Sequence, residues 1–205
     1  MAVDPRVIER IGESLRDARA LAQASAGEQP SGAGRSTASG RVAPVTSILA
    51  QAANLYGAKP NEEQTPPTGF DPAAALLFEA LIEGAFLVAN ADGDFDADER
   101  AAFEQVVLAA SGATLGPAQL AALVADLEDA LAEDGLDQRI TALSKTIAKA
   151  EQQGEVLRIA ALIAQVSGGV SEVELGVMRK LAAGFGLEPS VVEQAIAEAE
   201  RVLGG

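Results

Sequence analysis

An acidic turn near the middle of the chain holds the residues whose types and spacing could do chemistry. Five carboxylates fall within the eight residues from position 92 to position 99: Asp92, Asp94, Asp96, Asp98 and Glu99. The chain contains no Cys and no His, so a metal ion would have to be bound by oxygen atoms. Oxygen ligands favour hard cations such as Ca2+ and Mg2+. The turn is therefore a candidate site for a divalent cation.

The turn does not follow the EF-hand pattern, in which loop positions 1, 3, 5, 7, 9 and 12 bind Ca2+ and position 6 is Gly. If Gly93 takes position 6, position 1 is Val88, which has no side-chain oxygen. If Asp92 takes position 1, position 12 is Phe103. Neither register completes an EF-hand.

Helix capping is a second interpretation of the same carboxylates. Asp96 and Glu99 have the spacing of a capping box, in which the first side chain accepts a hydrogen bond from the amide three residues on and Glu accepts one from the cap amide. Ser171 and Glu174 repeat this spacing later in the chain. A capping box needs no metal.

Capping leaves Asp92 and Asp94 unexplained. They flank Gly93, and two further negative charges there raise the electrostatic energy unless solvent, a base or a cation relieves it. Arg100 is the only base nearby in sequence. A cation site and a solvated acidic cap both remain open.

Helices must position these residues, because apolar residues recur at helical spacing from Asp71 onward and no segment alternates as a strand would. Glycine is expected just past the helix ends, for example at Gly93, Gly135 and Gly154. The predicted helices cover residues 71–91, 96–110, 117–133, 137–152, 155–166, 171–183 and 189–203. The predicted fold class is all-α.

An internal repeat organises these helices. Residues from Ala85 match residues from Ala160 at an offset of 75, so that Gly93 falls on Gly168 and Glu99 on Glu174. The match predicts a pseudo-symmetric bundle of about seven helices, in which a linking helix joins two helix-turn-helix-helix halves.

The segment before this domain has a different composition. We predict an amphipathic helix at 1–26, a flexible linker at 27–43, a short helix at 44–57, a second linker at 58–70 and the helical domain at 71–205. The first 65 residues contain seven acids and seven bases, so the whole net charge of −15 belongs to residues 66–205. The N-terminal helix could dock on its own domain, on a second copy of the chain or on a separate partner.

Composition excludes several classes of function. Thiol nucleophiles and Ser-His triads need residues that the chain lacks, and only 3% of residues are aromatic. The net charge of −15 disfavours nucleic acid as a partner. Glu79 and Glu83 interrupt the longest apolar stretch, residues 72–91, which disfavours membrane insertion. We therefore predict a non-catalytic, cytoplasmic protein.

The segment AFLVANADGDFDADER, from Ala85, resembles the TerB family of tellurite-resistance proteins, whose alanine-rich helical repeats carry paired Ala-Asp-Gly turns followed by Glu. ALIAQVSGGVSEVEL, from Ala161, is similar to a degenerate second copy, and KLAAGFGLEPSVVEQAI, from Lys180, to the family's helix–loop–helix. The resemblance covers about residues 71–203. The second turn has Ser167 where the family prefers Asp, so a cation shared by both halves would lose one ligand.

The resemblance implies an all-helical domain with an acidic surface, divalent-metal binding, and a stress-response role near membrane-associated protein partners. The residues that it carries over as metal ligands are Asp92, Asp96, Glu99 and Glu174, to which the local charge argument adds Asp94. The leading prediction is a TerB-like protein that binds Ca2+ or Mg2+ at the acidic turn and engages protein partners. The alternative is a metal-free acidic module that docks a basic partner or forms a homo-oligomer through its N-terminal helix.

Overall fold

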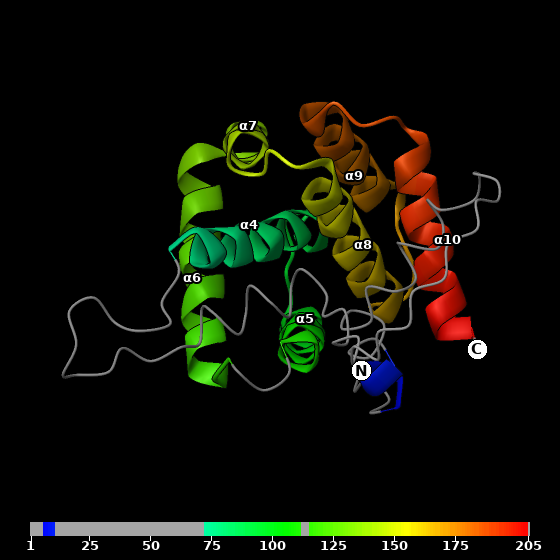
Figure 1. Ribbon diagram of the computed structural model, residues 1–205. Helices are drawn as coiled ribbons and strands as arrows, with labels where there is room; N and C mark the ends of the chain where they lie inside the picture. The colour runs from blue at the N-terminus through cyan, green and yellow to red at the C-terminus, as the bar shows by residue number, and fades with distance from the viewer. Residues whose placement is uncertain (1–5, 11–71, 112–114, 205) are drawn as a thin grey trace, which may run out of the picture.

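Helices dominate the part of the chain that the structure describes. The computed structural model describes residues 6–10, 72–111 and 115–204, and these residues contain no β-strand. The labelled helices are α4 (Pro72–Ala89), α5 (Ala97–Ala110), α6 (Pro117–Asp134), α7 (Leu136–Thr146), α8 (Ala150–Val166), α9 (Glu172–Phe185) and α10 (Ser190–Gly204) (Figure 1). The all-α prediction is confirmed. The predicted segments 27–43, 44–57 and 58–70 lie outside the described residues.

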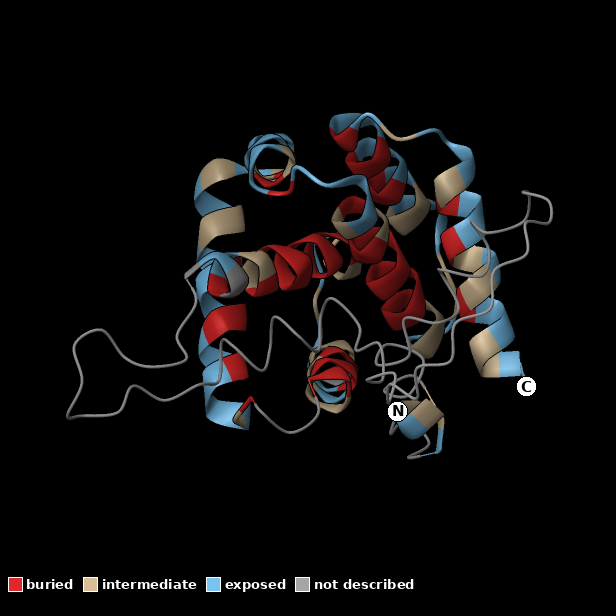
Figure 2. Ribbon diagram, in the orientation of Figure 1, coloured by how far each residue is buried: buried red, intermediate tan, exposed pale blue. Residues whose placement is uncertain are grey.

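Helices α4 and α8 form the centre of the core. The apolar stretch that begins at Pro72 becomes α4, on which Phe78 and Phe86 are fully buried, and α8 is buried from Glu155 to Ala164 (Figure 2). The two helices pack against each other. Gly84 permits their close approach, because a Cβ atom at this position would lie 2.2 Å from Cγ1 of Val156.

The other helices cover this centre on different sides. Helices α9 and α10 pack on α8, whereas α6 and α7 pack on α4. Figure 1 shows α6 crossing behind the first turns of α4, with α7 above α4 and α5 below it. Two apolar residues of the described N-terminal segment, Val7 and Ile8, also pack against the core.

A buried ion pair lies on the side of α8 that faces α10. Arg158 and Glu155 are 3% and 1% exposed, and Arg158 Nε donates to Glu155 Oε2 at 2.8 Å. Glu198 of α10 lies 3.6 Å from the same guanidinium. Because buried charges are costly unless they are paired, this contact fixes α10 against α8.

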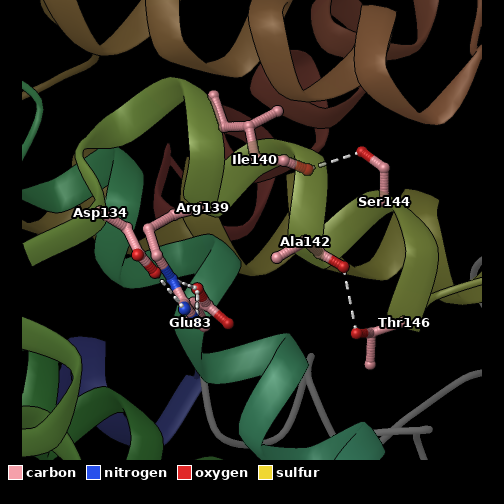
Figure 3. Close-up of polar contacts among 7 residues, drawn as sticks. All are labelled: Glu83, Asp134, Arg139, Ile140, Ala142, Ser144 and Thr146. Atoms are coloured by element: carbon pink, nitrogen blue, oxygen red, sulfur yellow. Dashed lines mark hydrogen bonds and ion pairs between the residues drawn. The ribbon is translucent and has the colours of Figure 1, made fainter. Parts of the chain in front are cut away.

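One predicted helix boundary is wrong. The sequence placed the break between the fourth and fifth helices at Gly154, but α7 ends at Thr146 and Gly154 lies inside α8. The hydroxyl of Thr146 donates to the carbonyl of Ala142, 3.1 Å away, at the C-terminal end of α7 (Figure 3). Buried Ile147 follows in an extended conformation, and its carbonyl accepts a hydrogen bond from the Gln153 side chain at 2.8 Å. A packed side chain and a side-chain cap thus end this helix without glycine.

The helix boundaries follow the internal repeat. Helices α5 and α9 both contain 14 residues, and both their ends are offset by 75 positions. Helix α7 joins helices α4, α5 and α6 to helices α8, α9 and α10, which is the position predicted for the linking helix. Symmetry between the two halves in space stays a prediction.

Candidate functional site

The acidic turn joins α4 to α5 through a tight backbone reversal. Gly93 has a φ of +82°, which favours glycine, and its amide donates to the carbonyl of Asn90 at 3.2 Å. The amide of Asp94 donates to Oδ1 of Asp92 at 3.0 Å, so one of the two unexplained aspartates stabilises the turn itself. Asp92, Asp94 and Asp96 are all exposed.

The predicted capping box is present at the start of α5. The amide of Glu99 donates to Oδ1 of Asp96 at 2.8 Å, and the amide of Asp96 donates to Oε2 of Glu99 at 3.1 Å. The second box is present at the start of α9, where Ser171 and Glu174 exchange hydrogen bonds of 3.2 and 2.7 Å. Capping therefore occupies one oxygen of each of Asp96, Glu99 and Glu174.

An aromatic cluster holds the turn against the core. The rings of Phe86, Phe95 and Phe103 meet edge to face, with centroids 5.5 to 6.4 Å apart. Arg100 lies 5.6 Å above the ring of Phe95 and pairs with Glu128 of α6. The base that is nearest to the aspartates in sequence is thus engaged with α6 and an aromatic ring.

Negative charge accumulates at this turn. Partial burial raises the pKa of Glu99, and the charges of Asp96, Asp92 and Asp94 raise it further, against the opposing effect of the hydrogen bond from the Asp96 amide. Among the described residues, no Arg or Lys forms an ion pair with Asp92 or Asp94. Three of the other predicted ligands therefore lie close enough for their charges to act on Glu99.

The five predicted ligands do not converge on one point. Glu174 lies in the first turn of α9 and is not among the charges that act on Glu99. Within the part of the chain that the structure describes, no three acidic side chains are arranged to hold a metal ion. The assignment of Asp92, Asp94, Asp96, Glu99 and Glu174 to a cation stays a prediction.

A second candidate site, which the sequence did not predict, is a groove between α4, α6 and α7 with a volume of about 520 Å3. Its apolar lining includes Leu76 and Ala80 of α4 and Leu123 and Leu127 of α6. Its charged lining consists of Glu79, Glu83, Asp126 and Arg139. We call this feature the acidic groove.

Arg139 is neutralised by two carboxylates beside the acidic groove (Figure 3). It contacts Glu83 of α4 at 2.6 Å and Asp134 of α6 at 3.0 Å, and so ties three helices together. Burial raises the pKa of Glu83, although the hydrogen bond and the charge of Arg139 act in the opposite direction.

Glu79 and Asp126 also line the acidic groove. Partial burial raises the pKa of Glu79, and the negative charge of Asp126 raises it further. No described residue forms an ion pair or a side-chain hydrogen bond with either carboxylate. One feature of the sequence pointed to this groove: Glu79 and Glu83 lie one helical turn apart on an otherwise apolar helix.

The acidic run from Asp126 to Asp137 is only partly the solvated helix face that its charge pattern indicates. Asp129 and Glu133 are exposed. Three other members of the run pair across helices: Glu128 with Arg100, Asp134 with Arg139, and Asp137 with Lys180. These pairs depend on how the helices pack, so spacing along the sequence could not reveal them.

Comparison with known protein families finds a match to this chain. The family model described as "Tellurite resistance protein TerB" matches residues 78–197, which is more than half of the chain. The match begins on α4 and ends on α10, and it includes the acidic turn and most of the residues that line the acidic groove. No curated protein and no solved structure matches the chain. None of the described helices is long and apolar enough to cross a bilayer.

Proposed function

The chain belongs to the TerB family of tellurite-resistance proteins, and we propose that it is a non-catalytic stress-response protein that binds a divalent cation at the α4–α5 turn and engages protein partners. The observation that supports cation binding is the charge of Asp92 and Asp94, which capping does not use. Their charges also raise the pKa of Glu99. A divalent cation would relieve this repulsion.

Cation binding at this turn would use carboxylate oxygens that the turn hydrogen bond does not occupy. Asp92 accepts the Asp94 amide with Oδ1, which leaves Oδ2 for a cation, and the side chain of Asp94 is exposed. The capping bonds use Oδ1 of Asp96 and Oε2 of Glu99. The proposal requires Asp92 and Asp94 to rotate toward a common cation, because the described carboxylates are not arranged around one point. Hard cations accept such mixed sets of carboxylate oxygens and water.

A thermal melt of the chelator-treated full chain, with and without millimolar Ca2+, Mg2+ or Mn2+, tests this proposal. A cation at a hundred times its dissociation constant stabilises the folded state by about 2.7 kcal/mol. For a chain of this size the midpoint should rise by about 5–10 °C. The double variant Asp92→Asn, Asp94→Asn should lose the rise, because the amide oxygen introduced at position 92 can still accept the turn hydrogen bond but both charges are gone.

The matched control is Asp129→Asn, which removes one exposed carboxylate from α6. This variant should keep the full response, because Asp129 lies outside the turn. A midpoint that no cation moves, or one that moves equally in the double variant, would contradict the cation site. The metal-free alternative would then stand, in which the acidic domain docks a basic partner or self-associates through its N-terminal helix.

A further inference from the structure

The acidic groove is long enough to hold one face of a short helix. Its lining on α6 runs from Gln119 to Ala130, a distance of about 16 Å along the helix axis, or about three helical turns. Ala80, Leu123 and Leu127 are buried in its floor. Leu76, at its edge, is 55% exposed, and it is one of only two large apolar side chains that are mostly exposed among the described residues.

The charge of the acidic groove sets the chemistry of its occupant. The three lining carboxylates and one lining guanidinium sum to −2, and Asp134 beside Arg139 adds another negative charge. Arg139 is already paired, and no described Arg or Lys pairs with Glu79 or Asp126, which lie beside the apolar floor. A complementary occupant must offer apolar groups to the floor and positive groups to this rim.

We propose that the acidic groove binds an amphipathic helix of a partner protein, with the apolar stripe of that helix on the floor and its Lys or Arg side chains beside Glu79 and Asp126. In helix-in-groove binding of this kind, the groove recognises apolar side chains that recur at helical spacing on the bound helix. The inference rests on the partner binding proposed above and names its site and the partner's chemistry.

The alternative occupants fit less well. A second copy of the helical domain would bring together two surfaces from the part of the chain that carries the whole net charge of −15. The described N-terminal residues 6–10 do not line the acidic groove. An inorganic cation would pair with the carboxylates but would leave Leu76 exposed to water.

The test is a titration of the 15N-labelled full chain with a synthetic amphipathic peptide of Leu, Ala and Lys, about 15 residues long. The amide shifts should concentrate on α4, α6 and α7 around the acidic groove. A matched peptide with Glu in place of every Lys should not bind. Affinity should fall as salt is added, because the rim charges are partly exposed.

Two variants and a control make the assignment specific. Asp126→Asn should weaken binding about two- to fivefold by removing one rim charge. Leu76→Ser should weaken it about five- to tenfold by removing an apolar contact. Asp129→Asn, on the same helix but outside the lining, should leave the affinity unchanged. All three positions are exposed, so these variants should fold.

Several results would overturn this inference. They are amide shifts confined to other surfaces, equal affinities of Asp126→Asn and Asp129→Asn, equal binding of the basic and acidic peptides, or no binding of the basic peptide. Shifts at the α4–α5 turn would remove the acidic groove as the site but leave partner engagement standing. The cation proposal is tested separately by the thermal melt, so the two can fail independently.

Discussion

At the scale of single residues, Asp96 and Ser171 do the same structural work with different chemistry. The side chain of each accepts a hydrogen bond from the backbone amide three residues on. The backbone amide of each donates a hydrogen bond to the side chain of the Glu at that position. Loss of an N-cap side chain costs about 1 kcal/mol. The aspartate differs from the serine by its charge, which acts on Glu99 beside Asp92 and Asp94.

Variants of these two caps separate capping from charge. In chelator, Asp96→Ala and Ser171→Ala should each lower the free energy of unfolding by about 1 kcal/mol, measured by urea denaturation. Asp96→Asn should be nearly neutral, because Asn caps as well as Asp. If Asp96→Asn cost as much as Asp96→Ala, the charge and not the cap would be the stabilising feature.

Local patterns in the sequence predict the capping box but not the acidic groove. A capping box is a local pattern, so the spacing of Asp96 and Glu99 was enough to predict two hydrogen bonds. Glu79 and Asp126 lie on helices that are far apart along the chain, and their proximity depends on how α4 crosses α6. No spacing rule contains that information, so the acidic groove emerged only from the packed helices.

At the scale of helices, glycine marks either an end or a close contact, and the sequence does not distinguish the two. Gly135 and Gly186 end helices with positive φ, as predicted for glycines past a helix end. Gly84 lies inside α4 against Val156, whereas Gly154 lies inside α8 at a point where an added Cβ atom would meet no neighbour. The glycine pattern therefore predicted most helix ends correctly and the start of α8 incorrectly.

A pair of alanine substitutions tests this distinction. Gly84→Ala should destabilise the protein by about 1–3 kcal/mol, because its Cβ would lie 2.2 Å from Cγ1 of buried Val156 and the central helices would have to separate. Gly154→Ala should stabilise it by about 0.5–1 kcal/mol, since alanine is the better helix former and meets no neighbour. Calorimetric midpoints that moved in the same direction for both variants would contradict this account of α4–α8 packing.

At the scale of the whole molecule, the excess of acid should make stability depend on pH. The described carboxyl groups Glu79, Glu83 and Glu99 all have a pKa raised above the ordinary value of 4.5, with burial as the largest cause. Each therefore binds its proton more tightly in the folded state than in the unfolded state. Their contribution to stability is fully present below pH 4.5 and is lost as the pH rises through the folded-state values.

The free energy of unfolding should therefore rise as the pH falls from 7.5 to 5, and the melting midpoint should rise by about 2–4 °C for each kcal/mol gained. The overall charge acts in the same direction, because protonation reduces the self-repulsion of a chain with a net charge of −15. Glu79→Gln should flatten part of this dependence, since the amide keeps the shape of the side chain but cannot titrate beside Asp126. Asp129→Asn, the exposed control on α6, should leave the slope close to that of the unmodified protein. A flat profile between pH 5 and 7.5 in urea denaturation would mean that Glu79, Glu83 and Glu99 are solvated or paired more fully than their contacts indicate.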